Sequence, residues 1–518
     1  MPQWTISSLL GVTAGFLERK GSSSPRLDAE LLLAHTLGLE RIQLYAQHDR
    51  PVTAPELDAY RELVARRAAH EPVAYLLGRA SFRYLELEVD PHVLIPRPET
   101  EELVEAVLDW LKENPLLEPF RTAVPHDGDE EAAVVDVGTG SGAIALSLAR
   151  EAGVVVLGID SSAEALALAA RNRDALGLEA RVSLASADLL VGREDGRFRV
   201  VVSNPPYVSH AELAGLAPDV REFEPLAALD GGVDGLAVYR RLVSQAGRAL
   251  GPGGALFLEL GEGQAEVVDG LACEAGFCLT RRLRDLSGKE RILLAVRPGC
   301  PRVDADGLTP DTAAMLTEAL HRGALLGVPT DTVYGLAAAW RSGPGVRRLF
   351  EAKGRGEESP VAVLFASVAA VKVSLPDLDP RAERVLQALL PGPYTFIVAT
   401  TVPRPPLVGT PDSLGVRVPT HPILLRVIEA LGVPLAATSA NFSGRPDPAS
   451  LDEVDPCLLA HCACGLAAST GSGASPLGLV STVVDLRPVA AGETARVLRE
   501  GAVSAGEALG RIAALLAD

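Results

Sequence analysis

The segment "VVDVGTGSGAIALSLA", residues 134–149, decides the fold of the first half of this 518-residue chain. It has the pattern of a buried strand, a glycine-rich turn and then a helix. Gly138, Gly140 and Gly142 permit a tight turn and a close approach of the backbone to a ligand. A glycine loop is not specific by itself, because dinucleotide sites and plain tight turns share it. The residues around it must therefore decide its function.

Strand-like and helical segments alternate on both sides of this loop. We expect strands at 132–138, 154–160, 181–188, 198–204 and 254–260, with helices between them. Such alternation predicts a mostly parallel sheet covered by helices on both faces. Three of the strands end in Asp160, Asp188 and Asn204, which places a binding site at the carboxyl edge of the sheet. A carboxylate at Asp160, about twenty residues after the loop, suits the hydroxyls of a ribose.

Composition excludes several classes of protein. Hydrophobic residues make up 47% and charged residues 22% of the chain, which is typical of soluble globular proteins. No apolar stretch is long enough for a bilayer, and the N-terminus lacks the basic leader of a signal peptide. The six cysteines form no disulfide framework, which favours a reducing cytoplasm. Residues 1–300 carry a net charge of −15 and residues 301–518 one of −4. The acidic first part argues against a broad phosphate-binding surface there, although a local basic site stays open.

The chain is too long for a single core, and we divide it into three parts. Residues 1–85 read as a small helical bundle, with Ser24 capping a helix that begins at Pro25, and with Thr53 and Glu56 at capping-box spacing. Residues 86–297 form the sheet-containing domain. "RPGCPR" at 297–302 is the best linker, and 303–518 suffice for a further α/β domain.

The motif "NPPY", residues 204–207, follows the fourth strand of the sheet. Pro205 and Pro206 offer carbonyl groups without N–H donors. Together with the Asn204 side-chain oxygen they form an acceptor surface for a planar –NH2 group, on which Tyr207 can stack. Adenine, cytosine and glutamine all present such a nitrogen. A proline-capped strand end is the structural alternative, which the glycine loop, Asp160 and Asp188 at the neighbouring strand ends disfavour.

"DVGTGSG", "GID" and "NPPY" in this order resemble a class I S-adenosylmethionine-dependent methyltransferase with a Rossmann-like fold. "LIPRPETE", "FEPLAALDGGVDGLAVYRRL" and "LELGEGQ" extend the likeness, to about residue 297, to the PrmC/HemK family. That resemblance implies transfer of a methyl group to the glutamine amide in the Gly-Gly-Gln loop of peptide chain release factors, with the glutamine held by Asn204, Pro205, Pro206 and Tyr207. It also implies a cofactor site made of Gly138, Thr139, Gly140, Ser141, Gly142, Asp160, Asp188 and Leu189.

Several details of this first site stay open. The family often has an aromatic residue where Leu189 stands, which weakens the expected stacking on adenine. Arg97, Glu99 and Glu101 are expected to brace the site or the partner loop, although they also fit a charged helix start. The alternative acceptors are a glutamine of a ribosomal protein and an adenine in a nucleic acid. The acidic charge favours a protein, so we expect no DNA partner.

The second half places cations and hydroxyl groups near the ends of apolar segments. They occur in "PTDTVYGL", "KGR", "SLGVRVP", "SANFSG", "STVVD" and "VLREG". The set contains no nucleophile–base pair and no Walker motif, and it suits phosphates and a carboxylate. The candidate residues are Thr332, Lys353, Arg355, Ser413, Arg417, Ser439, Asn441, Ser481 and Arg499.

In this order the motifs resemble the YrdC family of threonylcarbamoyl-AMP synthases, over about residues 305–518. The resemblance implies a twisted α/β domain that joins L-threonine, bicarbonate and ATP, with Mg²⁺, and releases pyrophosphate. Lys353 and Arg355 would hold phosphates, whereas Arg417 and Thr332 would hold threonine. The product would pass to tRNA-modification enzymes. The chain ends soon after Arg499, so we expect no additional domain such as the longer synthases carry.

The sequence therefore predicts a fused, bifunctional, cytoplasmic enzyme without a membrane partner. The rival interpretation of its second half is a non-catalytic RNA- or nucleotide-binding module. Cys457, His461, Cys462 and Cys464 invite a zinc site, but their spacing matches no usual zinc pattern and their surroundings are apolar. We interpret the cysteines as core residues and expect no metal ligated by the protein.

Overall fold

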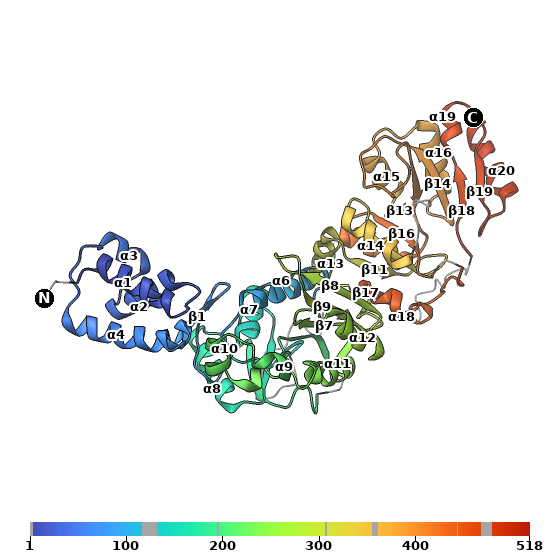
Figure 1. The fold of residues 1–518 in the computed structure, drawn as a ribbon. Coiled ribbons are helices and arrows are strands. Elements are labelled where there is room, and N and C mark those ends of the chain that lie inside the picture. The colour runs from blue at the N-terminus through green and yellow to red at the C-terminus, as the bar shows by residue number, and fades with distance from the viewer. Residues whose placement is uncertain are drawn as a thin grey trace.

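The computed structural model describes residues 4–116, 132–193, 196–305, 308–354, 361–442, 444–467 and 479–517. Figure 1 shows a helical unit at the N-terminus, a central α/β unit and a second α/β unit in a row along the chain. This architecture confirms the predicted fold class. Among the described residues, no helix is both long and apolar enough to cross a membrane.

The N-terminal unit is a helical bundle followed by a hairpin. Its helices pack around a core that contains Leu32, Leu33 and Tyr60. Ser24 and Pro25 stand at the start of the second helix, and Thr53 and Glu56 form the predicted capping box. The elements are α1 (Ile6–Arg19), α2 (Pro25–Leu37), α3 (Arg41–Ala46), α4 (Ala54–Ala68), α5 (Val73–Leu77), β1 (Arg79–Phe82) and β2 (Leu85–Glu88). The hairpin β1–β2 is a difference from the helical pattern expected up to residue 85.

The central unit is a seven-stranded sheet in the order β5-β4-β3-β6-β7-β9-β8. The first five of these strands run parallel, and β9 pairs antiparallel with β7 on one side and with β8 on the other. The predicted strand segments are all found. The strands are β3 (Val134–Val137), β4 (Val156–Asp160), β5 (Val182–Ser186), β6 (Phe198–Ser203), β7 (Leu250–Glu259), β8 (Leu279–Arg284) and β9 (Glu290–Val296). The helices are α6 (Pro98–Glu113), α7 (Ala143–Glu151), α8 (Ala163–Ala175), α9 (His210–Leu213), α10 (Pro218–Phe223), η2 (Leu226–Ala228), α11 (Ala237–Ala249) and α12 (Ala265–Glu274).

The two faces of this sheet bury separate cores. One contains Trp110 and Val107 of α6 with Leu148 of α7, and the other contains Tyr239 and Leu242 of α11. Hydrophobic residues fill the strands almost continuously, as a sheet buried on both faces requires. The carboxyl ends of β3, β4, β5 and β6 consequently open toward one edge.

The second α/β unit is built on a ten-stranded mixed sheet in the order β10-β17-β11-β12-β16-β13-β15-β14-β18-β19. Its strands are β10 (Arg302–Asp304), β11 (Leu325–Val328), β12 (Gly335–Ala339), β13 (Ala362–Leu364), β14 (Tyr394–Ala399), β15 (Ser413–Arg417), β16 (Leu435–Ser439), β17 (Cys462–Ala467), β18 (Thr482–Asp485) and β19 (Arg496–Arg499). Its helices are α13 (Pro310–Arg322), α14 (Gly343–Lys353), α15 (Val368–Ser374), α16 (Pro380–Leu389), α17 (Pro422–Leu431), η3 (Leu451–Glu453), α18 (Pro456–Leu459), α19 (Arg487–Ala490) and α20 (Ala505–Leu516).

The two α/β units pack on each other through α6. Its C-terminal residue Glu113 pairs with Arg348 of α14 at 2.8 Å. Ala460, after α18, belongs to the same apolar cluster as Trp110 of α6. The segment 297–302, predicted as a linker, is held as well, because the Gly299 N–H donates to the Pro456 carbonyl at 2.7 Å and Cys300 is buried. The connection is thus short and packed.

Candidate active sites

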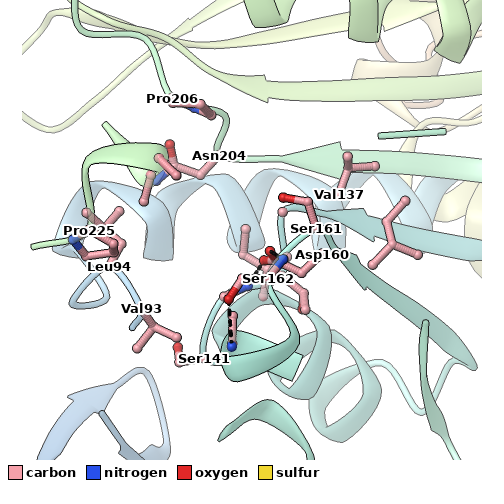
Figure 2. Close-up of a pocket in the computed structure, with 18 of the residues that line it drawn as sticks. Val93, Leu94, Val137, Ser141, Asp160, Ser161, Ser162, Asn204, Pro206 and Pro225 are labelled. Atoms are coloured by element: carbon pink, nitrogen blue, oxygen red, sulfur yellow. Dashed lines mark hydrogen bonds between the residues drawn. The ribbon is translucent and has the colours of Figure 1, made fainter. Parts of the chain in front are cut away.

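The first site is a cavity of about 420 Å³ at the carboxyl edge of the central sheet. Figure 2 shows Asn204 and Pro206 on one side of the pocket, and Asp160, Ser162 and Ser141 on another. Segments far apart in sequence meet here, because parallel strands bring their carboxyl ends to one edge. The lining residues predicted from the sequence are Gly138, Thr139, Gly140, Ser141, Asp160, Asp188, Leu189, Asn204 and Pro206.

The glycine loop is fixed by Asp160. One carboxylate oxygen accepts the N–H of Gly140 and the other accepts the N–H of Ser162, each at 2.9 Å. Gly138 and Gly140 have positive φ, and a Cβ at either position would meet no atom within 4 Å. The loop therefore leaves open space above its backbone. Gly142 is not among the lining residues, and a Cβ there would come within 2.9 Å of the Leu146 side chain.

Beneath the loop lies a buried carboxyl group, Asp136. One of its oxygens accepts the Thr139 hydroxyl at 2.7 Å and the N–H of Ala145 at 3.1 Å, and the other has no partner. Burial raises the pKa of Asp136 to about 7, although these two hydrogen bonds oppose the shift. Asp136 thus holds both the loop and the first turn of α7.

The end of β5 contributes Asp188 and Leu189. The Asp188 carboxylate pairs with Arg241 at 2.6 Å and its side chain is largely exposed. Leu189 adopts φ of 55°, an unusual value for a residue with a branched side chain, and it lines the cavity. A strained backbone of this kind is concentrated at functional sites in proteins.

The NPPY segment divides between the cavity and the core. Asn204 and Pro206 line the cavity, whereas Pro205 and Tyr207 are not among its lining residues. The Tyr207 ring packs against the apolar cluster around α11, and burial raises its pKa to about 12. Its carbonyl accepts a hydrogen bond from Gln264 at 2.9 Å, which anchors the end of the segment. A stacking role for this ring stays a prediction.

Residues of the segment 91–100, just before and within the first turn of α6, line another side of the cavity, and only Arg97 among them was predicted from the sequence. Arg97 donates to the buried Glu224 carboxylate at 2.6 Å, and Glu101 accepts the N–H of Arg83 at 3.0 Å. Thr100, which also lines the cavity, hydrogen-bonds to Asn204. The motif "LIPRPETE" signalled this helix start, but nothing in it singled out the threonine.

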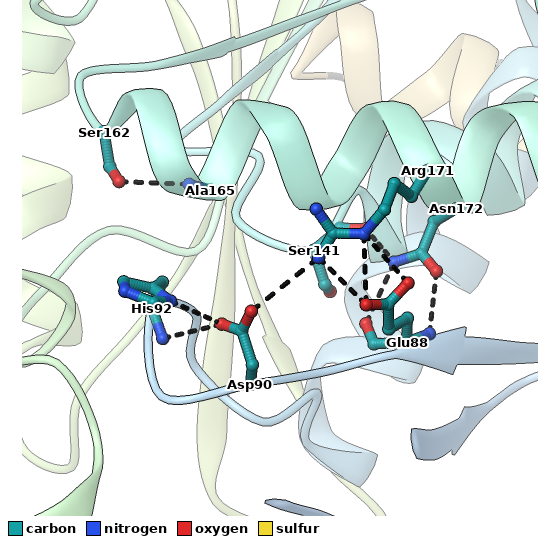
Figure 3. A network of polar contacts seen from close by, with 8 residues as sticks. All are labelled: Glu88, Asp90, His92, Ser141, Ser162, Ala165, Arg171 and Asn172. Atoms are coloured by element: carbon teal, nitrogen blue, oxygen red, sulfur yellow. Dashed lines mark hydrogen bonds and ion pairs between the residues drawn. The ribbon is translucent and has the colours of Figure 1, made fainter. Parts of the chain in front are cut away.

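A buried amide ties the preceding segment to the glycine loop. In Figure 3, the side chain of Asn172 on α8 points toward Glu88 and Ser141. Its oxygen accepts the Glu88 N–H at 2.7 Å, and its nitrogen donates to the carbonyls of Glu88 at 3.0 Å and Ser141 at 2.9 Å. The same figure shows His92 beside Asp90. The His92 Nδ1 atom lies 3.0 Å from a carboxylate oxygen of Asp90. The position of Asn172 inside a helix gave no sign of this role.

The second site is a cavity of about 320 Å³ over the mixed sheet. It lies where β12, β13, β14, β15, β16 and β18 run side by side. Hydroxyl groups and guanidinium groups supply its polar surface. The lining residues predicted from the sequence are Thr332, Ser413, Arg417, Ser439, Ser481 and Arg499.

Arg417 is held at the base of this cavity. It pairs with the Asp331 carboxylate and donates to the Thr332 hydroxyl at 2.7 Å. Lys353, at the end of α14, donates to the Ser439 carbonyl at 2.6 Å and to the Asn441 side chain at 2.9 Å. Arg355, predicted beside it, lies outside the described residues.

Metal ligands do not cluster in the described parts of the chain: no group of three or more His, Cys, Asp or Glu side chains could hold an ion there. Cys462 and Cys464 are buried on β17, and Cys457 is half-buried. Burial lowers the pKa of His461 to about 4. Cys462 and Cys464 belong to the two core clusters of the second α/β unit.

Known proteins resemble both halves of the chain. A release factor glutamine methyltransferase of Geobacter sulfurreducens is 46% identical over 291 residues, which cover 56% of this chain and 96% of that protein. The chain belongs to the release factor glutamine methyltransferase family. A second member, from Rhodopirellula baltica, is 42% identical and covers 56% of this chain and 95% of its own length. Family models described as "PrmC N-terminal domain" and "Methyltransferase small domain" match residues 8–78 and 116–217.

The second half of this family member carries a further domain. The Sua5–YciO–YrdC family model, described as "Telomere recombination", matches residues 318–501. A solved structure, P. abyssi Sua5 complexed with L-threonine, is 30% identical, with a TM-score of 0.35 and 41% of this chain covered. The chain spans about 60% of the length of that protein.

Proposed function

We propose that this chain is a bifunctional enzyme of translation that works in the cytoplasm. Its first half methylates the side-chain amide of the glutamine in the Gly-Gly-Gln motif of peptide chain release factors, using S-adenosyl-L-methionine. The observation that carries this proposal is that Asn204 and Pro206 share one cavity with the glycine loop and Asp160. A single pocket can therefore hold a methyl donor against an amide.

The residues of the cavity fit S-adenosylmethionine, which supplies an electrophilic methyl group on a sulfonium. The open space above Gly138 and Gly140 leaves room for the methionine part beside the backbone. The Asp160 carboxylate stands at the end of the second strand and is suited to the ribose hydroxyls. Leu189 gives an apolar wall for the adenine ring.

The acceptor amide would be held at the other side of the same pocket. The Asn204 nitrogen donates to Thr100 at 3.1 Å, which leaves the Asn204 oxygen as an acceptor. With a carbonyl of the adjoining Pro205–Pro206 segment it would bind both hydrogens of the glutamine –NH2 and direct the nitrogen lone pair toward the methyl group. Positioning of this kind contributes most to a displacement that needs no strong base. The proton released by the new ammonium-like nitrogen passes to solvent.

The first experiment identifies the acceptor. Purified protein is incubated with labelled S-adenosylmethionine and, separately, a release factor, a ribosomal protein mixture and duplex DNA, and peptide mapping locates the methyl group. We expect label on the release-factor glutamine, and its loss in Asn204→Ala, with Asn114→Ala on the far end of α6 as the control. Label on a ribosomal protein or on DNA alone would overturn the assigned substrate.

The second half, we propose, makes threonylcarbamoyl-AMP from L-threonine, bicarbonate and ATP. Arg417, Thr332 and Ser439 line a cavity suited to a carboxylate and phosphates, and Lys353 lies directly behind it. The carbamate of threonine and ATP are both anions, so these cations, together with Mg²⁺ on the phosphates, would screen their repulsion. The product would be consumed by the enzymes that modify tRNA.

Pyrophosphate release tests the second activity. We expect release only when threonine, bicarbonate and ATP are all present, and the adenylate to appear in mass spectra of the products. ATP turnover that ignores threonine, or none at all, would instead favour a nucleotide- or RNA-binding module.

A further inference from the structure

A chain of hydrogen bonds leads from the proposed glutamine site to a buried carboxylate. The Asn204 nitrogen donates to the Thr100 hydroxyl oxygen at 3.1 Å, and the Thr100 hydroxyl donates to Glu259 at 2.6 Å. Thr100 is only 4% exposed and Glu259 only 2%. The three residues come from three elements, since Thr100 is in the first turn of α6, Glu259 ends β7 and Asn204 follows β6.

The charge of Glu259 determines the direction of this chain. An ionised carboxylate is an acceptor only, so it takes the single hydroxyl proton of Thr100. The Thr100 oxygen can then only accept, which selects the Asn204 rotamer whose N–H faces Thr100. That rotamer turns the Asn204 oxygen away from Thr100, toward the position of the substrate amide.

Protonation of Glu259 would remove this selection. The carboxylic acid can donate to Thr100, which frees the threonine hydroxyl proton to face Asn204. An Asn204 side chain that accepts this proton turns by half a revolution and presents its –NH2 to the site. Two –NH2 groups would then face each other, and the glutamine would lose an acceptor.

Resting on the proposed methyltransferase activity, we propose that Glu259, acting through Thr100, is the positioning residue that fixes the Asn204 amide, and that methyl transfer requires Glu259 to be ionised. Glu259 does not contact the reacting atoms in this scheme. Its effect passes through the Thr100 hydroxyl group alone. Without that hydroxyl, the rate of methyl transfer must no longer depend on the ionisation of Glu259.

The surroundings of Glu259 place its ionisation near neutral pH. Burial raises the pKa of Glu259 to about 7, the Thr100 hydrogen bond lowers it, the nearby Glu99 raises it, and Arg291 and Arg97 lower it. The Tyr239 hydroxyl donates to the backbone carbonyl of Glu259 at 2.7 Å and so leaves the carboxylate to Thr100. The charged and titratable groups around the Glu259 carboxyl group come from four elements. They are Arg97 and Glu99 at the start of α6, Tyr207 after β6, Tyr239 on α11 and Arg291 on β9.

The test compares the pH dependence of kcat in variants of the full chain, with the release factor as substrate. We expect the wild-type kcat to rise about tenfold between pH 6 and pH 8, with its midpoint near 7. Thr100→Val should lower kcat at pH 8 about tenfold or more and flatten the profile, whereas Thr100→Ser should restore both. Glu259→Gln should flatten the profile as well. The matched control is Glu262→Gln, at an exposed carboxylate three residues away, which should keep the wild-type profile.

Binding of S-adenosylmethionine separates positioning from loss of fold. Calorimetry should give the same affinity for wild type, Thr100→Val and Thr100→Ser, because the glycine loop and Asp160 are untouched. If wild type transfers no methyl group to the release factor, the proposed function is wrong. If it does, and Thr100→Val keeps the wild-type kcat and midpoint, the positioning role is wrong. Should Glu259→Gln fail to fold, the two Thr100 variants decide the question alone.

Discussion

Asp136 makes the stability of the central domain depend on pH in a direction opposite to that of most carboxylates. Its folded-state pKa of about 7 lies above the ordinary value of 3.8, so the folded state favours the protonated form. Stability is therefore greatest at low pH and is lost as the pH rises from about 4 to about 7. A difference of about three pKa units corresponds to about 4 kcal/mol at full ionisation.

The substitution Asp136→Asn isolates this effect. The Asn side-chain oxygen can accept hydrogen bonds from the Thr139 hydroxyl and the Ala145 N–H, as Asp136 does in the wild type. The amide is uncharged at every pH, so it has no ionisation to oppose folding. We expect the variant to equal wild type near pH 4 and to be up to about 4 kcal/mol more stable near pH 8. It should retain its affinity for S-adenosylmethionine, because the loop bonds survive.

Native-state hydrogen exchange measures the free energy of unfolding of this domain within the full chain. The exchange is followed by mass spectrometry on peptides from β3 and α7 and is corrected for intrinsic exchange rates. Asp174→Asn, an exposed position on α8, is the control and should differ from wild type by less than about 0.5 kcal/mol at each pH. A difference between Asp136→Asn and wild type that stays constant from pH 4 to pH 8 would refute the reasoning.

Two further substitutions test the binding sites. Asp160→Ala removes the acceptor of the Gly140 and Ser162 N–H groups, so affinity for S-adenosylmethionine in calorimetry should fall about 10- to 100-fold; an unchanged affinity would rule out this site. Arg417→Lys keeps the charge, but a lysine cannot bind Asp331, Thr332 and a ligand at the same time. In the pyrophosphate-release assay the KM for threonine should therefore rise about tenfold, whereas the KM for ATP should change little. Equal changes in both constants would contradict a threonine site.

The sequence predicted the central sheet because its signals are local. The strand, turn and helix of residues 134–149 follow from hydrophobic periodicity and from glycines at positions of positive φ. Because the strands were predicted to be parallel, Asp160 and Asn204 could be placed at the same edge of the sheet from the sequence alone. The polar strand ends were therefore predictable as a group.

Contacts between distant residues escaped prediction. Thr100 and Glu259 are 159 positions apart, and each looks ordinary in its own segment. The ten-stranded order of the second sheet depends on pairings such as β13 with both β15 and β16, which no local pattern specifies. The segment 297–302 has the composition of a linker, yet Cys300 is buried there by residues more than a hundred positions later.

The packing of α6 against the second α/β unit limits how the two halves can be handled or exchanged. Separation of the two halves at residues 297–302 would expose the apolar surface around Ala460 and would break the ion pair between Glu113 and Arg348. Each half expressed alone would expose an apolar surface to solvent, which favours aggregation. A second half taken from another protein would therefore have to match this surface as well as supply its own chemistry.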